Sequence, residues 1–133
     1  MSASEYYEVE DVPLPAGVEG KVDALTVLPD GRLAVGTLEG GRVTLYDPER
    51  GEWQLFAEGL HEPMGFHAPA GDGDGGLELV AMQRPELTHL RDANGDGFAD
   101  RYETISDAFG LSGNYDEFGN GVAVDGEGNY YVS

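Results

Sequence analysis

One strand-turn-strand pattern recurs along the chain and constrains its fold more than any other feature. Residues 23–37, DALTVLPDGRLAVGT, join two alternating apolar runs through a PDG turn, and residues 119–133, GNGVAVDGEGNYYVS, do the same through GEG. Between them, residues 64–82 have the same layout around a longer acidic, glycine-rich turn. The copies recur at about 45 to 50 residues, which is the spacing of propeller blades. The sequence therefore predicts one repeated β-hairpin unit.

Each complete repeat is expected to contain four strands. GRVTLYD and EWQLFA follow the first hairpin, and LTHLRD and DRYETISD follow the second. The predicted fold class is all-β, a partial β-propeller of about two and a half four-stranded blades, with a β-sandwich as the alternative. The expected units are an N-terminal extension (1–22), blade one (23–57), blade two (58–107, with its strands in 64–107) and the start of a third blade (108–133).

An incomplete ring would leave sheet edges and an apolar flank uncovered, because closure takes about four to eight blades. We therefore expect either a fragment of a longer protein or self-association. The 21 glycines and seven prolines among 133 residues agree with many turns and short strands, and the 40% of hydrophobic residues can fill a modest core.

Charge and cysteine content exclude several functions. With 26 acidic and seven basic residues the formal net charge is −19, which repels nucleic-acid phosphates and anionic lipids. Lys21 is the sole lysine, and such a surface is familiar from proteins of concentrated salt, although an ordinary acidic secreted protein is the alternative. The absence of cysteine excludes disulfides, thiolate metal sites and C-x-x-C-H haem attachment.

The sequence also predicts no membrane insertion. No stretch approaches the roughly 18 apolar residues of a membrane-spanning helix. The first residues, MSASEYYEVEDVPLP, lack the basic and apolar regions of a signal peptide.

Residues 91–104, RDANGDGFADRYET, have the ligand spacing of a calcium loop, which spans 92–103. Oxygen-bearing side chains alternate, Gly97 permits a sharp turn at the sixth position, and a glutamate stands at the twelfth. The predicted metal ligands are Asp92, Asn94, Asp96, the backbone carbonyl of Phe98, Asp100 and Glu103. Several flexible oxygen ligands favour calcium over magnesium. The alternative is an acidic hairpin that binds no metal.

The position of this loop predicts its role. It joins the expected third and fourth strands of blade two, and such turns lie on the propeller face opposite the connections between blades. We therefore expect a structural ion rather than a catalytic one. A second acidic tract, GDGDGG at 71–76, lacks a closing glutamate and is interpreted as a solvated turn.

Three connections are expected to meet on the other face: LHEP (60–63), QRPE (83–86) and NYDEFGN (114–120). Their polar side chains could bind a polar ligand, with an arginine as the fixed cation and a histidine or carboxylate as the proton acceptor. These candidates are His61, Glu62, Gln83, Arg84, Glu86, Asn114, Asp116, Glu117 and Asn120.

Structural roles are the alternative for many of these residues. Glu62 could only shape a turn, and Arg84 could pair with Glu86 or with a neighbouring blade. His67 and His89 are expected at packed or edge positions of strands. The aromatic residues expected to pack between blades are Tyr46, Trp53 and Phe56.

Several stretches resemble a known family. QRPELTHLRDANGDGFADRYET and GLSGNYDEFGNGVAVDGEGNYYV, together with residues 6–37, are similar to the N-terminal propeller of large membrane-bound dehydrogenases of planctomycetes and related bacteria. These are relatives of the soluble glucose and sorbosone dehydrogenases that use pyrroloquinoline quinone (PQQ). The resemblance implies an exported parent protein, a sugar or alcohol substrate, calcium and PQQ.

The resemblance also suggests roles for individual residues. The implied catalytic residues are His61, Arg84 and Asp116, and the implied cofactor-binding residues are Gln83, Arg84 and Asn114. Asp116 stands where the family pattern has histidine. Two functions follow as expectations: part of a quinoprotein dehydrogenase, inactive alone because too few blades enclose the cofactor, or a calcium-stabilised binding or scaffold module without chemistry.

Overall fold

The computed structural model describes residues 8–9, 11–14, 22–70, 76–84, 86–106 and 122–132. In these residues the chain forms three antiparallel sheets of four, four and two strands, joined by turns and one short 3-10 segment, η2 (Glu39–Gly41). The predicted all-β class is confirmed. The expected site positions Asn114, Asp116, Glu117 and Asn120, and most of the acidic tract at 71–76, lie outside the described residues.

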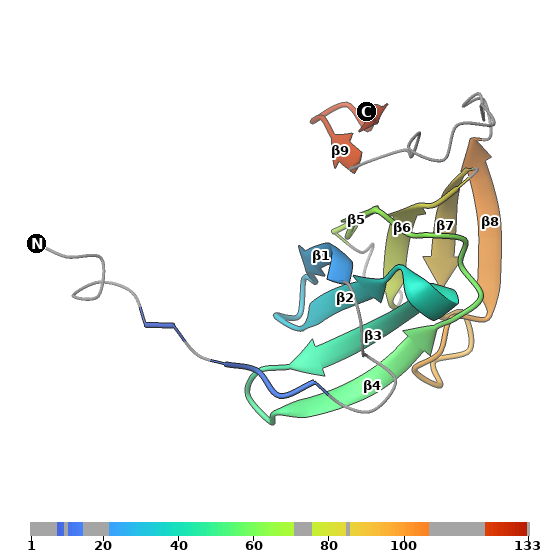
Figure 1. The fold of residues 1–133 in the computed structure, drawn as a ribbon. Helices are drawn as coiled ribbons and strands as arrows, with labels where there is room; N and C mark the ends of the chain where they lie inside the picture. The colour runs from blue at the N-terminus through green and yellow to red at the C-terminus, as the bar shows by residue number, and fades with distance from the viewer. Residues whose placement is uncertain are drawn as a thin grey trace, which may run out of the picture.

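Each four-stranded sheet is a simple meander in chain order (Figure 1). The strands of the first sheet are β1 (Val22–Val27), β2 (Leu33–Thr37), β3 (Arg42–Asp47) and β4 (Glu52–Ala57). The strands of the second sheet are β5 (Gly65–His67), β6 (Glu78–Met82), β7 (Leu87–Arg91) and β8 (Arg101–Ser106). The sheets thus occupy the segments in which the sequence predicts the first two four-stranded repeats.

The third sheet is a hairpin of β9 (Val122–Val124) and β10 (Tyr130–Val132). Its turn repeats the turn between β1 and β2 bond for bond. The Leu28 amide donates to the Arg32 carbonyl at 2.8 Å, and the Asp125 amide donates to the Asn129 carbonyl at 3.1 Å. Glycine at the third turn position has positive φ in both, +91° at Gly31 and +85° at Gly128. The two hairpins are therefore copies of one local structure.

The sheets pack face to face, and the core lies between them. Residues opposite one another in neighbouring strands share a sheet face, so Ala34 and Leu45 point to the same side, as do Leu79 and Leu90. These four side chains form one buried cluster with Phe56 and Phe66 between the first and second sheets. On the other face of the second sheet, the β9–β10 hairpin packs against a smaller buried cluster, which contains Val80, Met82 and Leu87.

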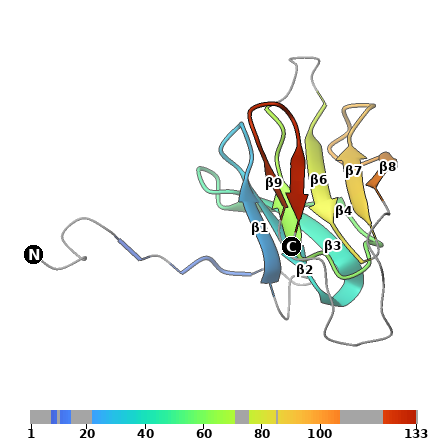
Figure 2. The same cartoon turned by 90° about the horizontal axis from the view of Figure 1, so that it is seen from above.

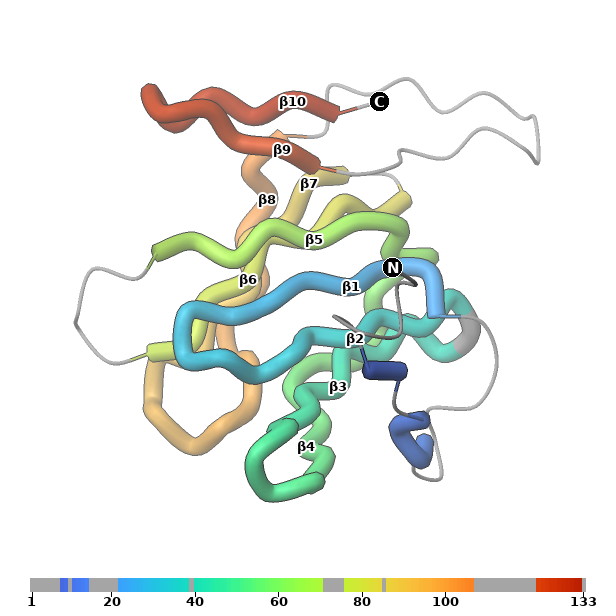
Figure 3. The backbone as a smooth tube through the Cα atoms, turned by 90° about the vertical axis from the view of Figure 1, so that its left-hand side faces the viewer, coloured from blue at the N-terminus to red at the C-terminus, as the bar shows by residue number. Residues whose placement is uncertain are grey.

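The first strands of the three sheets lie side by side. β5 contacts both β1 and β9, so the three strands follow one another across the molecule (Figures 2 and 3). The later strands of each meander extend away from this line (Figure 1).

The aromatic residues of β3 and β4 divide between the two faces of the first sheet. Alternation along β4 puts Phe56 and Trp53 on opposite sides, so Phe56 enters the core whereas Trp53 faces outward. Trp53 stacks on Tyr46, with ring centroids 4.8 Å apart, and donates its indole N–H to the carbonyl of Pro13 at 3.0 Å. Packing between the described sheets is thus found for Phe56 only.

Candidate functional site

Two of the three connections that the sequence predicts to meet, 60–63 and 83–86, lie together at one end of the sheets, beside the β2–β3 connection. The third, 114–120, lies outside the described residues. The Leu60 amide donates to the Gly41 carbonyl at 3.0 Å, and the Arg84 amide donates to the His61 carbonyl at 2.7 Å. Gly41 has φ +56°, and a Cβ there would collide with the Leu60 carbonyl. Glycine is therefore required for the close approach of these two connections.

Gln83 holds this end of the molecule together. It is 8% exposed, its side-chain oxygen accepts the His61 amide at 2.7 Å, and its side-chain nitrogen donates to the Thr88 hydroxyl at 2.7 Å. Both ends of the amide are thus bonded within the chain. The buried amide positions its neighbours through these two bonds, which use one of its two N–H groups and one of its two oxygen lone pairs.

His61, Glu62, Arg84 and Glu86 lie around Gln83. The Arg84 guanidinium is 3.3 Å from the Glu62 carboxylate, and both side chains are partly buried. The Arg84 guanidinium is thus paired with a carboxylate of the β4–β5 connection. Glu62 has φ +53°, a left-handed conformation uncommon outside glycine. Glu86 and Gln83 bond to each other through their backbones at 2.8 and 2.9 Å.

The acidic loop between β7 and β8 is organised by its own carboxylates. The two oxygens of buried Asp92 accept the amides of Gly95 at 2.8 Å and Gly97 at 2.9 Å. Asn94 accepts the amide of Asp96 at 3.0 Å, and Asp96 accepts that of Phe98 at 2.9 Å. These bonds fix a succession of tight turns in which Asp92, Asn94 and Asp96 each cap the backbone two or more residues further on.

The rest of the predicted ligand set is divided between the loop and the following strand. Asp100 accepts the amide of Ala93 at 2.7 Å and so closes the base of the loop. Glu103 belongs to β8 and lies opposite His89 in the register. In the described part of the chain, no three His, Asp or Glu side chains gather closely enough to form a metal site.

The loop is attached to the first sheet. Gln54 of β4 donates its side-chain N–H to the Gly97 carbonyl at 3.0 Å, and the Ala99 amide donates to the Phe56 carbonyl at 2.8 Å. Tyr102, just after the loop, lies within hydrogen-bond distance of the Glu58 amide and carbonyl, at 3.3 and 3.2 Å. We call these contacts the β4 clamp. They join the two sheets at the end opposite His61 and Arg84.

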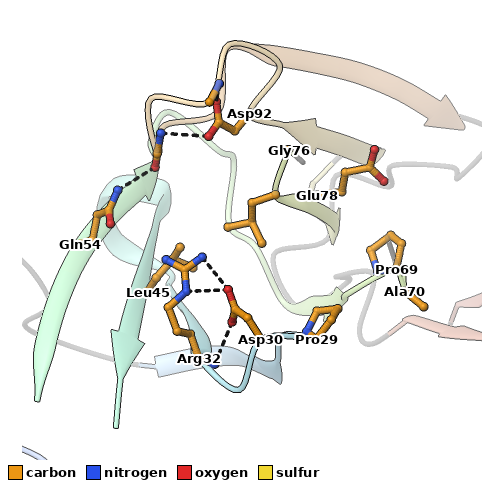
Figure 4. Close-up of a pocket in the computed structure, with 13 residues that line it drawn as sticks. Pro29, Asp30, Arg32, Leu45, Gln54, Pro69, Ala70, Gly76, Glu78 and Asp92 are labelled. Carbon is orange, nitrogen blue, oxygen red and sulfur yellow. Dashed lines mark hydrogen bonds and ion pairs between the residues drawn. The ribbon is translucent and has the colours of Figure 1, made fainter. Parts of the chain in front are cut away.

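A cleft of about 660 Å³ lies beside this loop (Figure 4). Its walls come from the β1–β2 turn, the β5–β6 connection and the β7–β8 loop, at the end of the sheets opposite His61 and Arg84. Asp30 and Arg32 form an ion pair at 2.8 Å on one side, and Asp92 lies on another. Burial raises the pKa of Asp30, but the hydrogen bonds and charge of Arg32 outweigh it, so the pKa lies below its usual value.

Sequence reasoning missed Gln54 and Thr88, which are the partners of the two candidate regions. Gln54 lies opposite Leu45 and therefore faces the second sheet. A polar residue at an inward position between apolar neighbours is the one local signal that could have singled it out. Thr88 gives no such signal, because threonine is common in strands.

Comparison of the chain with protein families, with curated proteins and with solved structures found no match. Within the described ranges, no helix is long and apolar enough to cross a membrane.

Proposed function

We propose that this chain is a propeller-type binding or scaffold module whose acidic loop binds calcium and thereby fastens the second sheet to the first. The observation that carries this proposal is the β4 clamp. Gly97 and Ala99 of the loop are bonded to Gln54 and Phe56 of the neighbouring sheet. An ion that orders the loop would also order this contact.

The loop residues suit calcium. Gly97 has φ +91° at the sixth position, where a calcium loop needs a sharp turn, and side-chain oxygens stand at the first, third and fifth positions. Each carboxylate that accepts a backbone N–H keeps further lone pairs for an ion. These side chains are not gathered as a metal site in the described structure, so Asp92, Asn94, Asp96, the Phe98 carbonyl, Asp100 and Glu103 would have to close around the calcium, which would neutralise their charge.

The propeller form is supported by the sheet arrangement. Both large sheets are four-stranded meanders, their first strands lie side by side, and the third hairpin repeats the turn of the first. Propeller blades are four-stranded units arranged radially about a channel. A binding role is favoured over catalysis because Gln83 already makes two bonds within the chain and Arg84 is paired with Glu62.

Thermal unfolding tests the calcium proposal. At a calcium concentration about 100 times Kd, binding to the folded state contributes about 2.7 kcal/mol, which raises Tm by roughly 10 °C in a domain of this size. Asp96→Ala should abolish the rise, because it removes a central ligand. Glu127→Ala, which removes the same charge from the exposed β9–β10 turn, should keep it. Equal Tm values for the unmodified chain with calcium and with chelator would overturn the proposal.

A quinoprotein dehydrogenase is the second candidate, favoured by the grouping of His61 with Arg84 at one end of the sheets. His61 would be the proton acceptor and Arg84 the cation. PQQ would have to compete with existing partners, because the Gln83 amide is bonded to His61 and Thr88 and Arg84 already has an acidic partner. Asn114 and Asp116, the other implied residues, lie outside the described ranges.

A further inference from the structure

The outward face of β1, on the side of the first sheet away from the second, is strongly apolar. Leu25 lies opposite Val35 and Val27 lies opposite Leu33, so all four side chains belong to this face. Leu25 is 60% exposed and Val27 is 62% exposed. Such exposure on neighbouring positions of one strand marks a surface that another apolar face could cover.

The equivalent positions of the third hairpin show what such a face does. The matching turns align Leu28 with Asp125 and Arg32 with Asn129, which places the pair Leu25–Val35 in register with the pair Val122–Val132. Val122 and Val132 pack on the second sheet, against Val80, Met82 and Leu87. In the third hairpin this face therefore docks on a neighbouring sheet, whereas the equivalent face of β1 in the first hairpin is exposed.

The opposite face of the third hairpin supplies the complementary half. Ala123 lies opposite Tyr131, and the turn alignment matches Tyr131 to Ala34. Ala34 is buried where the first sheet receives the second. Tyr131, in contrast, is 59% exposed. Within the described ranges, the docking face of β1 at one end of the molecule and the receiving face of the third hairpin at the other thus both carry exposed side chains.

We propose that two copies of this chain associate head to tail, with the Leu25–Val27 face of one copy packed on the Ala123–Tyr131 face of the next. The contact would repeat the relation that the β9–β10 hairpin already has to the second sheet. It is heterologous, because the two surfaces that meet are different, and each pair of copies leaves one face of each kind free for further growth.

Charge sets the conditions for this association. A net charge of −19 on each copy opposes contact, and the opposition is screened when the Debye length falls to about 3 Å at 1 M salt. Burial of apolar surface is not weakened by the same change. Association should therefore strengthen as salt is raised.

Light scattering after gel filtration in 1 M salt tests the interface with three variants. The unmodified chain should rise above the monomer mass as its concentration increases. Leu25→Arg and Tyr131→Arg each remove one face and should each be monomeric alone. Both also reduce the net negative charge, so a loss of association could not come from added repulsion. Ile105→Arg makes the same change on the exposed strand β8 and should associate like the unmodified chain.

Mixing the two monomeric variants gives the decisive outcome. Leu25→Arg keeps an intact Ala123–Tyr131 face and Tyr131→Arg keeps an intact Leu25–Val27 face, so the mixture should form a 1:1 heterodimer that cannot grow. Circular dichroism of each variant checks that its strands are retained. A monomeric unmodified chain at every concentration, association by either variant alone, or a mixture that stays monomeric although both variants are folded would overturn the proposal.

Discussion

Individual glycines show which close contacts the fold requires. Gly95 and Gly97 belong to the same acidic loop and both have positive φ, +77° and +91°. A Cβ at Gly95 would meet no atom within 4 Å, whereas a Cβ at Gly97 would collide with the side-chain nitrogen of Gln54. Substitution at Gly95 therefore tests backbone strain alone, whereas substitution at Gly97 tests backbone strain together with the contact that joins the sheets.

We expect Gly97→Ala to destabilise the protein by about 1 kcal/mol more than Gly95→Ala. Both substitutions cost the strain of a left-handed alanine, roughly 1 kcal/mol, but at Gly97 the Gln54 side chain must also leave its hydrogen bond. Denaturant unfolding of both variants measures the difference. In a Gln54→Ala background the difference should shrink towards zero, and an unchanged difference there would show that Gln54 is not its cause.

At the scale of elements, one aspartate organises the β9–β10 hairpin. One oxygen of Asp125 accepts the amides of Glu127 and Asn129, both at 2.9 Å. The other accepts the Asn129 side-chain N–H at 3.0 Å and the Tyr131 hydroxyl at 2.9 Å. The side-chain and backbone hydrogen bonds of Asn129, followed by that of Tyr131, lower the pKa of Asp125 to about 2.

This low pKa predicts a definite pH dependence. Because the pKa is lower in the folded hairpin, the stabilisation is fully present above the ordinary aspartate value of 3.8 and is lost as the pH falls through about 2. A carboxyl NMR titration should place the Asp125 midpoint near 2, and Tyr131→Phe should raise it by removing one donor. A midpoint near 3.8 in the folded chain would contradict these bonds.

The elements also show what sequence reasoning can reach. A hairpin turn with glycine at its third position, as at Gly31, is determined by residues adjacent in the sequence. Such turns could therefore be predicted, and so could the segments that form the sheets. The outward position of Trp53 follows from alternation along β4, and packing of Trp53 against a further blade stays a prediction. The attachment of the acidic loop to Gln54 could not be predicted, because it joins residues that are distant in sequence.

The same limit applies to the candidate site. The meeting of His61 with Gln83 and Arg84 was predictable, because connections of antiparallel strands alternate between two ends. The hydrogen bonds of the Gln83 side chain to His61 and Thr88 depend on side-chain directions that the sequence does not specify. Residue types alone therefore could not predict which polar side chains of the site are already hydrogen-bonded within the chain.

In the molecule as a whole, apolar packing and polar contacts at both ends of the sheets hold the described parts together. The cluster containing Leu45, Leu79 and Phe56 holds the two large sheets together, and the β4 clamp fixes the loop beside it. The central claim is that calcium acts on the clamp and not on the core.

Amide hydrogen exchange with and without calcium tests this claim most directly. The Ala99 amide, bonded to the Phe56 carbonyl at 2.8 Å, reports the clamp, and the Leu60 amide, bonded to Gly41 at the other end, reports general stabilisation. At about 100 times Kd, calcium should slow exchange at Ala99 by up to about 100-fold, well beyond its effect at Leu60, if opening of the clamp requires release of the ion. Equal effects at the two amides, or none at Ala99 when calcium is bound, would contradict the account.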